Sequence, residues 1–143
     1  MPLNNFSIGR DVSLDIITPQ GPVKFSLITK FKSKMDITDK KIKGLDGMTR
    51  HLRFPDGWSG EFEIDRQDST ADDYFSQIEA NYYAGLNEQP GTLTETITEP
   101  NGNVTQYRYV NVLLKYDDAG EWLGDSEVKQ RVSFVAAQRI KVA

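Results

Sequence analysis

Alternating hydrophobic and polar positions in the middle of the chain predict a strand that leads directly into a helix. In an extended chain from 57 to 66, one face carries the hydrophobic and small residues Trp58, Gly60, Phe62 and Ile64. The other face carries the polar and acidic residues Ser59, Glu61, Glu63 and Asp65. This period of two is typical of a strand with one buried and one solvated face.

The residues that follow predict a helix over about 70–84. Ser69 and Thr70 each precede an aspartate by three residues, which resembles a capping box with Asp in place of Glu. These aspartates, Asp72 and Asp73, also place negative charge at the positive end of a helix. Apolar residues then recur at the spacing of one buried helical stripe, at Ala71, Tyr74, Phe75, Ile78 and Tyr82. Gly85 is well placed to end the helix in the left-handed conformation.

Similar alternation elsewhere predicts about seven strands in total. Beyond a first hairpin around 18–22, strands are expected at 48–53, 58–64, 92–99, 104–116 and 128–136. Pro-Asp-Gly at 55–57 is expected to turn the chain between two of them. Sequential strands with short connections favour a mainly β (α+β) fold, an antiparallel sandwich or barrel with the helix on its flank.

The segment at about 32–47 stands apart because it is too polar and too long for an ordinary turn. We expect a long arm loop there, with either a functional role or mobility. Between 30 and 53 the chain has eight basic residues and only three acidic ones, although its net charge is -4. One basic segment on an acidic protein favours contact with an acidic surface, and another copy of the chain offers one.

Composition limits the class of protein further. The chain has 143 residues, of which 38% are hydrophobic, and fits a single domain, 1–143, able to bury a core. It contains no cysteine, which excludes disulfides and thiolate metal sites. No apolar run is long enough to span a bilayer, and the first residues lack a secretory pattern, so we expect cytoplasmic assembly and no membrane partner.

Candidate catalytic chemistry is weak throughout the sequence. His51 is the only histidine, and nothing near it resembles a strained nucleophile turn. Glu61 and Glu63 could imitate a glycosidase pair, but such spacing is common on solvated strands. The acids around 117–121 do not have EF-hand spacing, and no phosphate-binding Gly-Lys-Ser or Gly-Lys-Thr occurs. We therefore expect no enzyme activity and no cofactor.

The strand-to-helix joint at 57–80, together with the segments at 91–102 and 124–130, resembles the tail tube proteins of contractile-tailed bacteriophages. The resemblance covers nearly the whole chain. It implies a virion structural protein of the tail that forms hexameric rings, stacks them into an inner tube and conducts DNA as transient cargo during ejection. Its implied partners are further copies of itself, the contractile sheath, and the baseplate and tail terminator proteins.

The resemblance also implies roles for three groups of residues. The basic arm is expected to reach a neighbouring subunit or ring, through Lys32, Lys34, Lys40, Lys41 and Lys43. An acidic face is expected to line the lumen and repel DNA phosphate, with the candidates Glu61, Glu63, Asp65, Glu95 and Glu99. The polar side of the helix is expected to face the sheath, through Asp72, Asp73, Gln77, Glu79 and Asn81.

Two alternatives remain open at this point. The chain resembles equally the tubes of type VI secretion systems and of phage-derived bacteriocins, which share the same architecture. A different class is a monomeric β-barrel that binds a small apolar ligand, which predicts a hollow apolar interior and a stable monomer.

Overall fold

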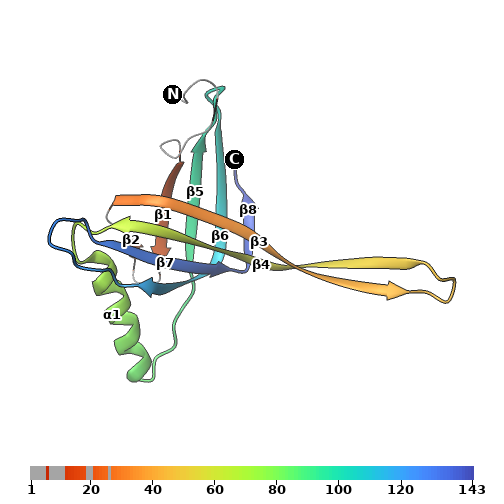
Figure 1. Cartoon of the computed structure of the whole chain (residues 1–143), viewed down its shortest axis with the longest axis horizontal. Helices are drawn as coiled ribbons and strands as arrows, with labels where there is room; N and C mark the ends of the chain where they lie inside the picture. Colours follow the sequence, from red (N-terminus) through yellow and green to blue (C-terminus); the bar gives the residue numbers. More distant parts are fainter. Residues whose placement is uncertain (1–5, 7–11, 19–20, 26) are drawn as a thin grey trace.

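The computed structural model describes residue 6 and residues 12–18, 21–25 and 27–143, which form eight strands and one helix (Figure 1). The first hairpin is confirmed, with its turn residues 19 and 20 outside the described part. The elements in chain order are β1 (Val12–Thr18), β2 (Gly21–Val23), β3 (Leu27–Lys43), β4 (Thr49–Asp65), α1 (Thr70–Tyr83), β5 (Gly91–Thr98), β6 (Val104–Asp118), β7 (Lys129–Ala136) and β8 (Gln138–Lys141).

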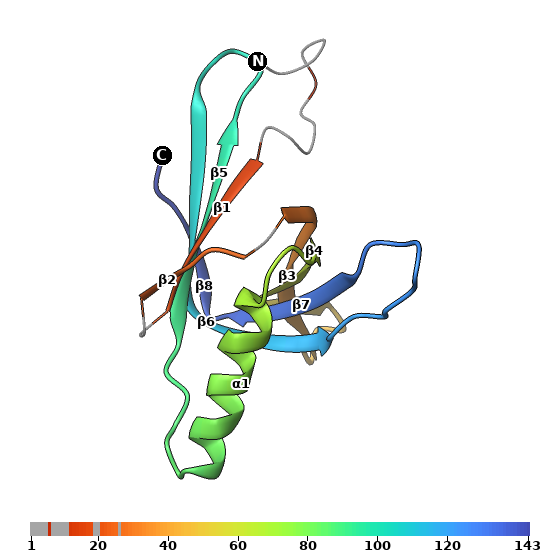
Figure 2. The same cartoon turned by 90° about the vertical axis from the view of Figure 1, so that its left-hand side faces the viewer.

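All strands pair antiparallel in one sheet of order β2-β1-β5-β6-β7-β4-β3, with β8 also on β6, and the sheet is not closed. The expected mainly β fold with one helix is confirmed. The sheet bends into two halves that cross each other (Figure 2). The upper half contains β1, β2, β5, β8 and the start of β6, and the lower half contains the end of β6 with β7, β4 and β3.

The bend lies in the middle of β6, which belongs to both halves. β6 pairs with β5 up to Val112 and with β7 from Leu113. Asn111, in the bulge of the β5–β6 pairing just before this change of partner, has a positive φ of 54°, a conformation that Asn tolerates better than most residues. Opposite this point the chain passes from β7 to β8 at Ala137, whose N–H donates to the Val110 carbonyl at 3.0 Å. The two halves are therefore joined through β6, which pairs with β7 in the lower half and with β8 in the upper half.

The core lies between the two halves of the sheet. The central strands supply fully buried side chains, Phe62, Ile64, Leu93, Tyr109, Val132 and Phe134. Phe62 and Ile64 occupy the face of β4 that the alternation predicted. The first turns of α1 cover one end of this core: Ala71 is buried, and the Phe75 ring stacks on Tyr116 with centroids 4.6 Å apart. These side chains form one packed cluster, and a cleft of about 1120 Å³ lies beside it between β1, β2 and the start of β3.

The expected arm loop is instead a β-hairpin. β3 and β4 have 17 residues each and remain paired from Ile37 with Pro55 to Lys43 with Thr49, well beyond the other strands. Figure 1 shows this arm, residues 36–56, projecting from the body. The length and polarity of the segment had predicted a loop. A projecting ribbon has no core face, so its strands lack the alternation that marks the others.

The turn expected at 54–57 is also wrong, because β4 passes through it. Pro55 is tolerated there because β4 pairs with β7 only from Trp58 onward, which leaves one edge of the arm free. The register shifts between Met35 and Ile37, where β4 has one extra residue. Gly57 lies in this bulge with φ of 103°, and a Cβ there would lie 2.5 Å from the Ala136 carbonyl oxygen.

The helix begins at Thr70 as predicted, but its capping differs from the expected box. Ser69 makes no side-chain bond to the helix backbone; its hydroxyl donates to the Asp73 carboxylate at 2.9 Å. The Asp68 carboxylate accepts from the Thr70 N–H at 3.1 Å. At the other end, Gly85 has the predicted positive φ, and Leu86 N–H bonds back to the Asn81 carbonyl at 2.9 Å, which forms a Schellman motif.

Candidate assembly surfaces

The candidate residues do not converge on one catalytic centre. Among the described residues, no three His, Asp or Glu side chains are grouped in a way that could hold a metal ion. The helix in this part of the chain is too short and too polar to cross a membrane. Apart from Glu95 and Glu99 on the upper half-sheet, the candidates lie instead on three surfaces: the outer face of the lower half-sheet, the arm, and the helix.

The outer face of the lower half-sheet carries a charged ladder of Glu61, Glu63 and Asp65 on β4 with bases on both neighbouring strands. Lys30 on β3 lies 3.9 Å from Glu61, Arg131 on β7 lies 3.4 Å from Glu63, and Lys129 on β7 lies 3.0 Å from Asp65. These acids share a face, as the alternation predicted. Cross-strand bases accompany each of them, and Lys32 and Lys34 on β3 add two more bases, so the face is not acidic.

The five arm lysines fall into two groups. Lys32 and Lys34 lie on the body portion of β3, opposite Glu61 and Ser59, and so belong to the outer face of the lower half-sheet. Lys40, Lys41 and Lys43 lie on the projecting arm and are exposed. None of the five forms an ion pair within the described residues. The sequence analysis assigned all five lysines to one arm because it predicted a single loop over about 32–47, whereas β3 begins in the body and ends in the arm.

The remaining lumen candidates lie elsewhere. Glu95 on β5 is only 6% exposed and points into the body beside Arg139 and Tyr109, and burial raises the pKa of its carboxyl group. It therefore does not lie on an open surface of the subunit. Glu99 lies at the far end of the β5–β6 hairpin, where its N–H bonds to the Asn103 carbonyl at 2.7 Å.

The arm has two chemically different faces because directly opposed residues of an antiparallel pair point the same way. One face carries Ile42, Leu52 and Phe54, which are 41–50% exposed, and we call it the apolar arm face. Lys40 lies on this face, opposite Leu52. The other face is apolar only near the body, at Ile37 and Pro55. Further out it is polar, with an ion pair between Arg53 and Asp39 at 3.0 Å and with the exposed residues Lys41, Lys43, His51 and Thr49.

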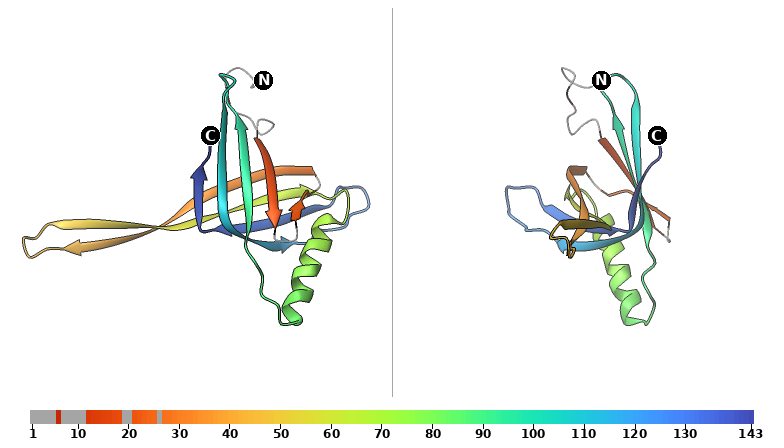
Figure 3. Two further views of the ribbon diagram at one scale, coloured as in Figure 1. Left: turned by 180° about the vertical axis from the view of Figure 1, so that it is seen from behind. Right: turned by 90° about the vertical axis from the view of Figure 1, so that its right-hand side faces the viewer.

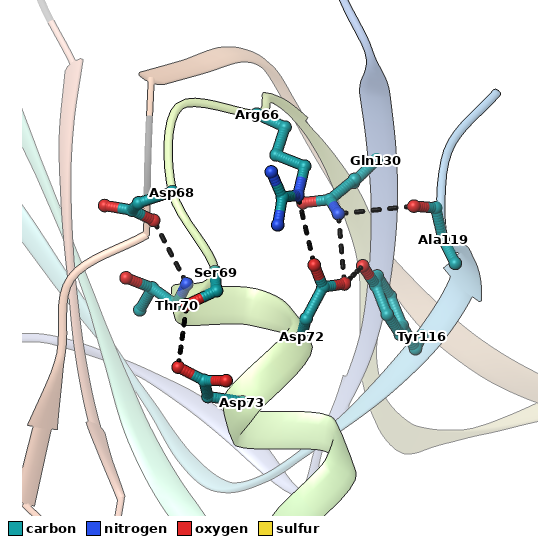
Figure 4. Close-up of polar contacts among 9 residues, drawn as sticks. All are labelled: Arg66, Asp68, Ser69, Thr70, Asp72, Asp73, Tyr116, Ala119 and Gln130. Carbon is teal, nitrogen blue, oxygen red and sulfur yellow. Dashed lines mark hydrogen bonds and ion pairs between the residues drawn. The ribbon is translucent and has the colours of Figure 1, made fainter. Parts of the chain in front are cut away.

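Asp72, a sheath candidate, is instead committed to a network that fixes the start of α1 (Figure 4). Its carboxylate accepts from the Tyr116 hydroxyl at 2.6 Å, from Arg66 Nε at 3.1 Å and from Gln130 Nε2 at 3.2 Å. The Tyr116 hydrogen bond, followed by the Arg66 contacts, holds the pKa of Asp72 below its usual range despite partial burial. Burial and the Asp72 carboxylate raise the pKa of Tyr116. The network joins the helix to β4, β6 and β7.

The other polar helix candidates divide by position. Asp73 and Gln77 are exposed, and Gln77 Nε2 donates to Asn81 Oδ1 at 2.8 Å. Glu79 is also exposed but borders a groove of about 610 Å³ along the helix. Its lining, here called the helix groove, includes Phe75, Ile78, Glu79, Tyr82, Tyr83, Leu86, Glu88 and Tyr116.

The last turns of α1 extend beyond the sheet, as Figure 2 shows. Tyr82 is 73% exposed, Tyr83 78% and Leu86 59%. Sequence reasoning assigned Tyr82 to the buried stripe and overlooked this surface. Tyr83 could have indicated this surface, because it is an aromatic residue outside the predicted buried stripe.

Among the strands that the structure describes, two edges of the lower half-sheet have no partner strand. Within this part of the chain β3 pairs with β4 alone, which leaves its outer edge without a partner strand from Leu27 to Met35. β6 loses β5 after Val112, so Leu113–Asp118 pairs only with β7. Unpaired edges of this length are templates for strand addition from another chain.

Comparison with known proteins shows which structures share this fold. No known family model matches the sequence, and no curated protein matches it. Solved structures do match. A chain in the sheath-tube complex of an extracellular contractile injection system in its extended state covers 99% of this chain and 94% of its own length, with a TM-score of 0.72 at 9% identity. The fold is that of tail-machinery chains.

Two further structures extend the similarity. A chain in the tube-terminating cap of the anti-feeding prophage covers 100% of this chain and 95% of its own, with a TM-score of 0.67 at 9% identity. A chain in the tail of an empty gene transfer agent particle with C6 symmetry covers 96% and 100%, with a TM-score of 0.58 at 11% identity. The resemblance inferred from the sequence is thus confirmed at the level of the fold.

Proposed function

We propose that this chain is a structural subunit of a tail tube, built from rings of its own copies stacked along an axis, in a phage-derived contractile tail. The observation that carries the proposal is the arm. An isolated two-stranded ribbon is marginally stable in water, and this one exposes Ile42, Leu52 and Phe54. Such a ribbon gains stability when a neighbouring subunit covers it. The full-length similarity to chains of tail assemblies supports another copy of this chain as that neighbour.

Ring closure uses the two free edges. The lower half-sheet presents four antiparallel strands in the order β6-β7-β4-β3. An even number of alternating strands makes the outer edge of β3 antiparallel to the β6 edge of the next copy. Six copies joined in this way would form one continuous barrel without an exposed edge, which explains how long free edges avoid aggregation.

In such a barrel the charged ladder would line the lumen. Each of its acids is paired with a base, and Lys32 and Lys34 add two further positive charges, so this wall would not repel a passing polyanion as an acidic wall would. This differs from the acidic wall expected from sequence. The proposal covers both DNA passage in a virion tail and transfer through an injection or secretion device, which share this architecture.

The outer partners follow from the same arrangement. A contractile sheath would surround the tube and contact the solvent side of α1 at Asp73 and Gln77, since Asp72 is already engaged. Terminator and baseplate proteins would cap the two ends. The alternative of a closed barrel with a hollow apolar interior receives no support from the sheet, which is open.

Negative-stain electron microscopy of the purified protein over a concentration series, with light scattering in parallel, tests the proposal. We expect six-fold rings or hollow tubes. A variant in which residues 37–54 are replaced by a two-residue turn should lose stacking while the body remains folded by circular dichroism. A compact monomer of the full chain at every concentration would overturn the tube proposal.

A further inference from the structure

The apolar arm face has no covering surface within its own subunit. Ile42, Leu52 and Phe54 are all exposed, and Lys40 next to them forms no ion pair within the described residues. A surface that fits this face must be apolar at its centre and acidic at its rim.

The helix groove is complementary to the apolar arm face: it is also apolar, but its charged residues are acidic. Tyr82, Tyr83 and Leu86 supply exposed apolar area, and about 610 Å³ of open space lies along them. Glu79 and Glu88 lie at its border, and neither forms an ion pair within the described part of the chain. The only lining acid with cationic contact is Asp72, which Arg66 already holds. The groove therefore offers two uncompensated carboxylates beside an aromatic surface.

We propose that the helix groove is the docking site for the arm of a second copy of this chain. The aromatic end of α1 packs on Leu52 and Phe54, and Glu79 or Glu88 meets Lys40. The proposal deepens the tube function and rests on it, because it names the surface that receives the arm.

The placement of the two surfaces supports a repeating contact. Figure 1 and the rear view in Figure 3 show the arm and α1 at opposite ends of the body. Neither surface can reach the other within one subunit. A contact between two different patches is heterologous, and where its rotation does not close a ring it continues from copy to copy, which is how an open-ended filament grows. Each added subunit would bury one arm and offer another.

Cysteine cross-linking tests the contact directly, because the natural sequence has no cysteine. One preparation carries Leu52→Cys and a second carries Tyr83→Cys, and the two are mixed, assembled and oxidised. We expect a disulfide-linked dimer on a non-reducing gel. His51→Cys tests the opposite face of the arm, and Gln77→Cys tests a helix position outside the groove. Both controls should give at least about tenfold less dimer, since disulfides require Cβ atoms within about 4.5 Å.

Charge reversal gives a second, independent readout. Lys40→Glu or Glu79→Lys alone should raise the concentration needed for assembly by about tenfold, because each places like charges together. The double variant should restore most of the loss. Lys41→Glu, one residue away on the other arm face, is the matched control and should have a smaller effect.

The outcomes separate this inference from the tube proposal. Tubes that assemble without a Leu52–Tyr83 cross-link, or without charge-swap rescue, overturn the docking site and leave the tube function standing. A cross-linked arm-to-helix species that never forms rings or tubes supports the docking site and overturns the tube. Absence of both cross-link and assembly overturns both.

Discussion

Arg139 on β8 lies over the ring of Trp58 on β4, with its guanidinium carbon 4.0 Å from the ring centroid. The Tyr107 ring lies on the same guanidinium at 3.9 Å. Trp58 is the first residue of β4 after the bulge at Gly57, where the arm leaves the body. This stacked arginine therefore attaches the base of the arm to the upper half-sheet and fixes the direction in which the arm projects.

Arg139→Ala is expected to loosen the base of the arm. Loss of two ring contacts should destabilise the fold by about 1 kcal/mol. Hydrogen exchange should rise at residues 34–38 and 55–59, because the arm pivots there. Arg108→Ala is the matched control, since Arg108 lies on the opposite face of the same half-sheet and is exposed. Equal exchange at the arm base in both variants would contradict the attachment.

Gly60→Ala is expected to destabilise the protein by about 2 kcal/mol, because overpacking in a filled core forces backbone movement. A Cβ at Gly60 would lie 2.2 Å from the Lys32 carbonyl oxygen and 2.8 Å from the Phe134 ring. Gly124→Ala is the control, since a Cβ at Gly124 has no atom within 4 Å. Urea denaturation measures both. A stability change at Gly60 no larger than at Gly124 would show that the strand pair relaxes freely.

Tyr116→Phe is expected to cost about 1–2 kcal/mol at neutral pH, somewhat less than a buried hydrogen bond to a charged group, because Asp72 is partly exposed to solvent. The Tyr116 hydroxyl is the main cause that lowers the pKa of Asp72. A lowered folded-state pKa stabilises the protein above the unfolded-state pKa, and this stability is lost as pH falls through the folded value. The difference from wild type should therefore shrink in acid. Thermal denaturation from pH 7 to pH 2 checks this, with the exposed Tyr83→Phe as control.

Glu95→Gln is expected to raise the thermal stability at neutral pH. Burial raises the pKa of Glu95, so the folded protein disfavours its charged form. Stability then falls as pH rises from the ordinary carboxyl value through the raised one, and glutamine removes this dependence. The advantage of the variant should grow from about pH 4 to pH 7. Glu121→Gln, on an exposed loop, controls for loss of one charge. An advantage that does not change with pH would contradict the argument.

Local patterns determined much of the fold by themselves. The alternation from Trp58 to Ile64 predicted a buried strand face, and the apolar spacing after Thr70 predicted the helix to within a residue or two. Gly85 predicted its end. These features depend on neighbours in sequence, because strand faces repeat every two residues and helical faces every three to four. The mainly β class and the likeness to tail proteins followed from the order of such segments.

Only the tertiary structure decided which surfaces these elements present. The arm is paired because β3 and β4 stabilise each other across sequence positions that show no core pattern. Glu95 is buried beside Arg139 and Tyr109, which lie on other strands. The Asp72 carboxylate is already hydrogen-bonded, because Tyr116 and Gln130 from two other strands donate to it. The acids of the ladder are paired because β3 and β7, which carry bases, flank β4. Local sequence fixes which way each side chain points along its own element, whereas long-range pairing fixes what stands opposite it.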